Sequence, residues 1–173
     1  MRESTRRVSE LVAAIKSYSQ MDRGSLQSVD VRRGLESTLV ILAPKLRNGV
    51  VVERDLGDLP QIDAYEGELN QVWTNLIDNA VDAMDGSGTL RISTRRDGDA
   101  VVVEVADTGE GMPPEVVERA FEAFYTTKPV GKGTGLGLDI ARRIVVDRHG
   151  GVIEVDSEPG RTVLRVRLPI QHR

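Results

Sequence analysis

The sequence predicts an α+β fold, a two-layer α/β sandwich with three helices on one face of a mixed, mostly antiparallel sheet. Apolar residues recur at three- and four-residue steps in a few segments, the pattern of helices that bury one face. Short β-branched runs follow one another in pairs across tight turns, which favours antiparallel hairpins over a parallel sheet. Hydrophobic residues make up 39% of the 173 residues, enough for a packed core.

Amphipathic helices are predicted in five segments, each with its apolar residues on one face. They are residues 4–23, 28–47, 66–84, 115–124 and 138–148. Pro44 falls late in the second of these segments, so the position of its end stays open. We assign residues 1–24 to a separate helical unit and residues 25–173 to one domain.

Strand-type segments fill most of the remaining chain. They are residues 49–56, 89–96, 100–107, 151–160 and 161–170. The second and third flank the tight turn DGD, and the last two form another hairpin. Residues 58–65 are expected to form a turn and a short extended segment.

Composition and charge argue against several classes of protein. The net charge is −4 and no long run of Lys or Arg occurs, so nucleic-acid binding is not expected. The absence of cysteine excludes a disulfide framework and a thiolate zinc site. No apolar stretch approaches ~20 residues, so no membrane contact is expected from this segment. A cytoplasmic protein, or the soluble part of a larger one, is therefore expected.

Four glycines, Gly131, Gly133, Gly135 and Gly137, stand at every second position just before the helix at 138–148. Ordering so many glycines in one place costs backbone entropy. Binding of a phosphate by backbone N–H groups at the start of the helix would offset that cost. Side chains in the same stretch suit a polyphosphate. They are Thr126, Thr127, Lys128, Lys132 and Thr134. The spacing fits neither a Walker A loop nor a Rossmann fingerprint, and a flexible surface linker is the alternative.

Polar residues interrupt the apolar pattern of the helix at 66–84. Asn75 and Asn79 are four residues apart on one face, and Asp82 follows three residues later. Two amides and a carboxylate can present oxygen atoms to a hard cation such as Mg²⁺. The alternative is a solvated helix face.

A second polar feature follows the predicted strand 100–107. The strand ends in Asp107, and Gly109 and Gly111 then allow the backbone to turn closely. A carboxylate at this place can accept a hydrogen bond from a ligand that lies against the main chain. An ordinary glycine turn after a strand is the alternative.

In this order and spacing, these segments resemble the nucleotide-binding motifs of the ATP-binding catalytic domain of sensor histidine kinases. The matching stretches are NLIDNAVDAM for the asparagine motif, DTGEGMP and GKGTGLGL for the two glycine motifs, and FEAFYTTKP for the phenylalanine motif. The resemblance implies the Bergerat-type ATP-binding fold, shared with gyrase, the Hsp90 chaperones and MutL. It covers roughly residues 28–170 and is closest to the nitrogen-regulatory type of histidine kinase.

The resemblance implies binding of ATP and Mg²⁺, with a role for each matching position. Asn79 is expected to coordinate Mg²⁺, and Asn75 to contact a phosphate or a metal-bound water. Asp107 is expected to accept a hydrogen bond from the adenine amino group, with Thr162 supporting Asp107 from behind. The turn PGRT beside Thr162 is shorter than the family's PGxGT, which leaves the register there open.

The resemblance also implies a lid at about residues 125–134, anchored by Phe121 and Phe124. The side chains expected to act in catalysis are Asn75, Lys128 and Lys132. The expected nucleotide contacts are Asn75, Asn79, Asp82, Asp107, Gly109, Gly111, Met112, Phe124, Thr127, Lys128, Lys132, Gly133, Thr134, Gly135, Leu136, Gly137 and Thr162. The glycines of the lid are expected to order over the phosphates only when nucleotide is bound.

A histidine kinase phosphorylates a histidine on a preceding helical hairpin, but this chain has only His149 and His172. His149 follows a predicted helix and precedes a glycine pair, so neither histidine is expected to accept the phosphoryl group. Residues 4–23 resemble the second helix of that hairpin and are compatible with a homodimer of the full-length protein. We therefore expect the acceptor histidine upstream or on another chain, with a response regulator as partner. The expected location is the cytoplasm, including the cytoplasmic part of a membrane-bound sensor.

The residue type at position 75 separates the branches of the superfamily. In the gyrase, Hsp90 and MutL branch, a glutamate at this place acts as general base for ATP hydrolysis. Asn75 cannot take that role, which favours transfer to an acceptor. Two alternatives stay open: an anti-sigma-type serine kinase and a non-catalytic module that associates with partners in an ATP-dependent way.

Overall fold

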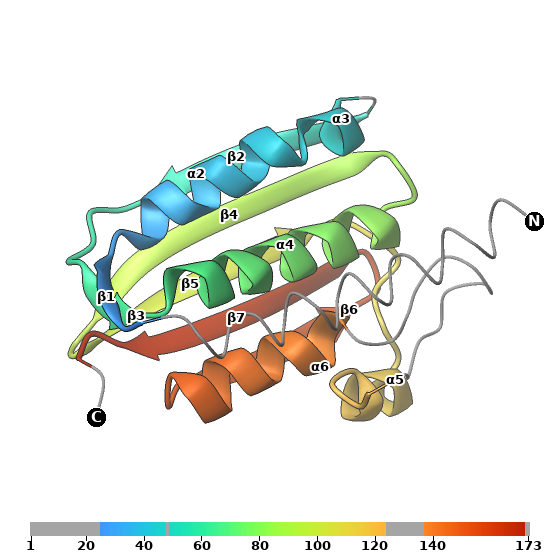
Figure 1. Ribbon diagram of the computed structural model, residues 1–173. Helices are drawn as coiled ribbons and strands as arrows, with labels where there is room; N and C mark the ends of the chain where they lie inside the picture. The colour runs from blue at the N-terminus through green and yellow to red at the C-terminus, as the bar shows by residue number, and fades with distance from the viewer. Residues whose placement is uncertain (1–24, 48, 124–136, 172–173) are drawn as a thin grey trace, which may run out of the picture.

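The computed structural model describes residues 25–47, 49–123 and 137–171, and a five-stranded sheet runs through it (Figure 1). The strand order is β2-β4-β5-β7-β6. The strands are β2 (Val50–Leu56), β4 (Gly88–Asp97), β5 (Ala100–Asp107), β6 (Val152–Glu158) and β7 (Arg161–Pro169). The β2–β4 pair is parallel and the other three pairs are antiparallel. The prediction of a mixed, mostly antiparallel sheet is confirmed.

Three helical segments cover one face of this sheet (Figure 1). They are α2 (Val31–Ile41), α4 (Glu66–Ala83) and α6 (Gly137–Arg142), which continues as the π-helix η1 (Arg143–Arg148). Two short helices, α3 (Ala43–Leu46) and α5 (Pro114–Arg119), stand before β2 and after β5 in the chain. The predicted α+β sandwich with three helices on one face is therefore confirmed.

The core lies between the helical layer and the sheet, and α4 contributes most to it. This helix packs against both α2 and α6. Its predicted apolar stripe is buried, and Trp73, Leu76 and Ile77 are at most 1% exposed. These side chains belong to the same cluster as Val103 and Val105 of β5. Since a fully buried side chain of this size contributes about 1.5–3 kcal/mol, the stripe fixes α4 on the sheet.

The opposite face of the sheet is covered by ion pairs that run from strand to strand. Arg91 of β4 pairs with Glu53 of β2 at 3.6 Å, and Arg95 of β4 reaches Glu104 of β5 at 3.9 Å. Arg165 of β7 lies 3.5 Å from Glu104 and 3.6 Å from Glu154 of β6. Acidic and basic strands thus alternate across the sheet. Opposite charges on neighbouring strands are typical of a face in contact with water.

The predicted helix at 28–47 is wrong at its start, and its end, which the sequence left open, lies at Ile41. Residues Gln27–Val29 form a short strand, β1, which pairs with β3 (Ile62–Ala64) in a separate two-stranded sheet. The helix α2 begins after Asp30, whose carboxylate accepts hydrogen bonds from the backbone N–H groups of Arg32 and Arg33. It ends before α3, since Pro44 has no N–H to continue the ladder.

Two other helices differ from their predicted bounds. The segment predicted at 115–124 forms a helix only over Pro114–Arg119, and none of its residues is buried. Without a buried face, packing does not lengthen the helix beyond its local preference. The segment at 138–148 is helical as predicted, but its second half is a π-helix. The helix predicted at residues 4–23 lies outside the described residues.

Candidate functional site

The polar stripe of α4 meets the start of α6 through the side chain of Asn75. Its Nδ2 donates a hydrogen bond to the carbonyl of Gly137, at 2.9 Å. Its Oδ1 accepts one from Nε2 of Gln71, one helical turn earlier, at 2.7 Å. Two segments singled out in the sequence, the asparagine motif and the end of the second glycine motif, therefore contact each other.

Asp107 ends β5 as predicted, and its carboxylate is buried, with 2% of the residue exposed. Oδ1 accepts a hydrogen bond from the Gly109 N–H at 2.8 Å. Oδ2 has no hydrogen-bond donor among the described residues. Burial raises the pKa of the Asp107 carboxyl above its ordinary value of 3.8, and the Gly109 N–H opposes that shift. The arrangement leaves the second carboxylate oxygen of this buried residue as an acceptor for a ligand.

Close backbone contacts require the two glycines that follow Asp107. A Cβ atom on Gly109 would lie 2.6 Å from the carbonyl oxygen of Ala83, at the end of α4. Gly111 has φ +81°, and a Cβ there would lie 2.2 Å from the carbonyl oxygen of Glu158. The first glycine motif is thus held between the end of α4 and the β6–β7 turn, where a side chain would not fit.

The predicted pocket residues Met112 and Thr162 are linked through Ser157. The Met112 N–H donates to the Ser157 hydroxyl at 2.8 Å, and the Ser157 and Thr162 hydroxyl oxygens are 2.7 Å apart. Thr162 stands opposite Asp107 in the β5–β7 ladder, which resolves the register left open by the short turn. Its contact with the Asp107 carboxylate stays a prediction.

The remaining predicted positions divide between described and undescribed residues. Asn79 is partly buried and Asp82 is exposed, both on α4 beyond Asn75. Several predicted contacts lie outside the described residues. They are Phe124, Thr127, Lys128, Lys132, Gly133, Thr134, Gly135 and Leu136. The predicted lid at about 125–134 and its ordering over the phosphates therefore stay predictions.

Sequence reasoning missed Gln71 and Ser157, both of which touch predicted site residues. Gln71 carried a usable signal, since it stands four residues before Asn75 and eight before Asn79 on the same helix face. Ser157 carried none, because its partner Met112 is 45 residues away in the chain. Only the β6–β7 hairpin brings the two together.

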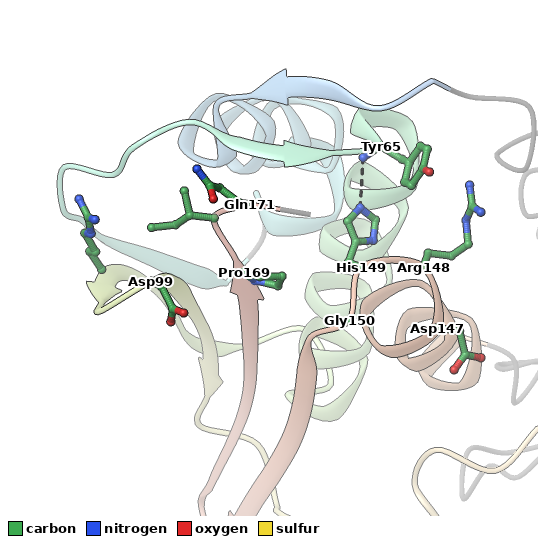
Figure 2. A pocket seen from close by; sticks show the side chains of 10 residues that line it. Tyr65, Asp99, Asp147, Arg148, His149, Gly150, Pro169 and Gln171 are labelled. Atoms are coloured by element: carbon green, nitrogen blue, oxygen red, sulfur yellow. Dashed lines mark hydrogen bonds between the residues drawn. The ribbon is translucent and has the colours of Figure 1, made fainter. Parts of the chain in front are cut away.

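A cavity of about 690 Å³ lies at the other end of the sheet (Figure 2). Its lining includes Tyr65, Asp99 and His149. Asp99 lies just before the first residue of β5 and Asp107 is the last residue of β5, so the cavity and the Asp107 site lie at opposite ends of this strand. None of the predicted nucleotide contacts lines this cavity. Arg148 lies over the Tyr65 ring, 4.2 Å from its centroid, and its guanidinium pairs with the buried Glu68 through two hydrogen bonds of 2.9 and 3.0 Å.

His149 is 3% exposed, and both of its ring nitrogens bond to the backbone. Nε2 lies 3.1 Å from the Tyr65 N–H (Figure 2) and Nδ1 lies 2.8 Å from the Ile144 carbonyl. The amide can only donate and the carbonyl can only accept, so the ring is neutral with its proton on Nδ1. These contacts suit a structural residue, in line with the expectation that His149 is no phosphoacceptor. His172 lies outside the described residues.

Residues 64–172 match the model of the family described as Histidine kinase-, DNA gyrase B-, and HSP90-like ATPase. The chain belongs to this family, and it is of the histidine kinase type, as the predicted resemblance had it. The sensor kinase CckA of Brucella abortus is 34% identical over 98% of this chain and 20% of its own length. The sensory histidine kinase/phosphatase NtrB of Azospirillum brasilense is 34% identical over 95% of this chain and 44% of its own.

Solved structures agree with the sequence comparisons. The nucleotide-free catalytic domain of the histidine kinase ThkA superposes with a TM-score of 0.79 at 28% identity, over 85% of this chain and 97% of that domain. Full-length ShkA in complex with AMPPNP gives 0.83 at 30% identity, over 99% of this chain and 38% of that protein. The chain thus matches nearly all of the ThkA catalytic domain. It spans about a fifth of the length of CckA and somewhat under half of the length of NtrB.

Proposed function

We propose that this chain is the ATP-binding catalytic part of a two-component sensor histidine kinase. It binds Mg-ATP and transfers the γ-phosphoryl group to a histidine on a helical hairpin that precedes it or belongs to another chain. The observation that carries the proposal is the buried Asp107 carboxylate, with one oxygen held by Gly109 and the other without a donor in the described chain. The family and the sensor kinase relatives support the same reading.

The Asp107 carboxylate recognises adenine in this proposal. Adenine carries an amino donor at the position where guanine carries a carbonyl acceptor. Oδ2 of Asp107 accepts from the adenine amino group, whereas the guanine carbonyl would face a buried negative charge. A buried polar group left unpaired is costly, so a site of this kind discriminates strongly. Gly109, Gly111 and Met112 form the wall against which the base lies.

The phosphates lie between α4 and the second glycine motif in this proposal. The described residues include no cluster of three or more His, Asp or Glu side chains that could hold a metal ion. Mg²⁺ usually keeps few protein ligands and takes the rest from phosphates and water, so the single amide oxygen of Asn79 fits it. When bound, Mg²⁺ supplies charge neutralisation at the phosphates. Lys128 and Lys132 add positive charge, and Thr127, Thr134 and the backbone from Gly133 to Gly137 donate hydrogen bonds.

Phosphoryl transfer then depends on positioning. An imidazole nitrogen of the acceptor attacks the γ-phosphorus, the bond to the β-phosphate oxygen breaks, ADP leaves and the imidazole releases its proton. Asn75 is no general base for water, because a carboxamide is not basic enough to take a proton. Transfer to histidine is therefore favoured over hydrolysis.

The partners follow from the same proposal. They are a phosphoacceptor hairpin and a response regulator, with a homodimer in the full-length protein. One solved structure shows the histidine kinase ThkA in complex with the response regulator protein TrrA. A protein of related fold therefore binds a partner of this kind. Among the described residues, no helix is both long and apolar enough to cross a membrane. We propose a cytoplasmic location for the domain, including within a membrane-bound sensor.

The test is phosphotransfer from ATP to a hairpin bearing a histidine. Residues 1–24 would be replaced by a helical hairpin that bears a histidine in an HE pair, and the chimera would be incubated with ATP labelled on the γ-phosphate. We expect an acid-labile, Mg²⁺-dependent label on the hairpin and none on the unmodified chain. A label on His149 or His172 would contradict the proposal. An acid-stable phosphoserine on a partner would favour the serine kinase, and ATP binding without transfer to any hairpin would favour the non-catalytic module.

A further inference from the structure

We propose that Gln71 is a positioning residue of the nucleotide site, which acts by fixing the carboxamide of Asn75 against Gly137. The inference rests on the proposed function, because it assigns to Gln71 a part in binding the phosphates. Gln71 is not among the residues that the sequence motifs mark. It contacts one of them, Asn75, from the preceding turn of α4, and both side chains are partly buried.

The carbonyl of Gly137 determines how the Asn75 amide is oriented. A carbonyl can only accept, so the group of Asn75 that lies 2.9 Å from it must be the NH₂. The amide oxygen of Asn75 therefore faces Gln71, which must donate to it, at 2.7 Å. If the Asn75 amide turned over, its oxygen would face the Gly137 oxygen and its NH₂ would face the NH₂ of Gln71. Both neighbours thus select one orientation.

This orientation joins α4 to the helical segment that follows the second glycine motif. Among the described residues, Gly137 begins a continuous helical run that extends to Arg148. A Cβ atom on Gly137 would stand 3.9 Å from the Asn75 Cβ, an ordinary contact. The hydrogen bond from Asn75, rather than a steric need for glycine, therefore sets the spacing of the two helices here.

The two hydrogen bonds leave Asn75 able to meet a ligand. Its amide keeps a second N–H, which can donate to a phosphate oxygen, and its Oδ1 keeps a lone pair for a metal-bound water. Nucleotide binding therefore does not require Asn75 to release Gly137. Gln71 restricts the Asn75 side chain before the phosphates bind, so less conformational freedom is lost on binding. Preorganisation of this kind strengthens binding.

The test compares the full chain with its Gln71→Met variant, which keeps the side-chain length and removes the donor. Titration with Mg-AMPPNP should show an affinity loss of roughly two- to tenfold, the range of one net hydrogen bond. In an Asn75→Ala background, Gln71→Met should cost nothing further, because Gln71 acts through Asn75. Gln61→Met is the control for the same substitution elsewhere: Gln61 makes a side-chain hydrogen bond too, accepting from the Ser28 hydroxyl at 2.6 Å, but lies on the β1–β3 side of the fold.

A spectroscopic measurement separates positioning from mere stability. The Asn75 side-chain amide signals in ¹⁵N-labelled protein without nucleotide should move in Gln71→Met and stay in place in Gln61→Met. Unchanged affinity in Gln71→Met, or an equal loss with and without Asn75, would overturn the inference. If the wild-type chain itself fails to bind Mg-AMPPNP, the proposed function fails. If the wild-type chain binds and Gln71→Met binds equally well, only the role of Gln71 fails.

Discussion

At the scale of single residues, burial of the Asp107 carboxylate has a clear electrostatic consequence. Its carboxylate is buried, and the Gly109 N–H compensates for only part of the lost hydration, so its pKa is raised from 3.8. The charged form is the one penalised in the folded protein. Asp107 therefore costs stability at neutral pH, and this cost lessens as the pH falls through the raised pKa. Such a residue is better explained by ligand binding than by stability.

Nucleotide affinity should depend on pH through this carboxyl group. Ionised Asp107 is the stronger acceptor for the adenine amino group, so ATP binding should weaken as the pH falls from 7 toward 3.8. ATP itself also titrates in this range, and the Asp107→Asn variant, measured at each pH, controls for that. The affinity advantage of wild type over Asp107→Asn should shrink on acidification, while circular dichroism verifies that both stay folded. A constant advantage would remove Asp107 from adenine recognition.

At the scale of elements, the run from α6 into η1 connects the two ends of the domain. Its first residue, Gly137, accepts the Asn75 hydrogen bond, and its last turn leads to His149, which holds the Tyr65 N–H. The helix at 138–148 was predictable from its apolar period. Its change to a π-helix was not, because over six residues the two helical periods place the same apolar side chains, Ile144 and Val145, toward the core.

Replacing His149 should lower stability without weakening nucleotide binding. His149→Leu leaves the Tyr65 N–H without its acceptor, which costs about 1–3 kcal/mol in the free energy of unfolding. The affinity for Mg-AMPPNP should stay unchanged, because this residue lies at the opposite end of the sheet from Asp107. Urea denaturation measures the first effect and calorimetric titration the second. The exposed neighbour Asp147 supplies the control, Asp147→Ala, expected within about 0.5 kcal/mol of wild type.

The elements that were not predicted are too short to show a periodic hydrophobic pattern. β1 and β3 have three residues each, too few for an alternation to show, and they exist because they pair with each other. The long hairpins β4–β5 and β6–β7 were predictable, since each joins two strand-type runs of at least seven residues across a tight turn. In the site, Asp107 was predictable from its place at a strand end. For Gln71 the sequence offers only its helical spacing from Asn75, and a polar residue at that spacing looks the same whether it faces water or Asn75.

At the scale of the whole molecule, the sandwich brings together motifs that are far apart in the chain. Asn75 and Gly137 are 62 residues apart, and Met112 and Ser157 are 45 apart. The helical layer and the end of the sheet supply the two walls of the proposed nucleotide site. The other face of the sheet carries cross-strand ion pairs, which leaves the site on the side of the helices.

Adenine recognition by Asp107 is tested most directly by calorimetric titration of the chain with Mg-ATP and Mg-GTP, repeated on Asp107→Asn. We expect wild type to bind ATP and discriminate against GTP, and Asp107→Asn to lose both affinity for ATP and most of that preference. Asn can donate as well as accept, so its amide no longer selects an amino group over a carbonyl. Equal binding of both nucleotides by wild type, or unchanged ATP affinity in Asp107→Asn, would show that Asp107 does not recognise adenine.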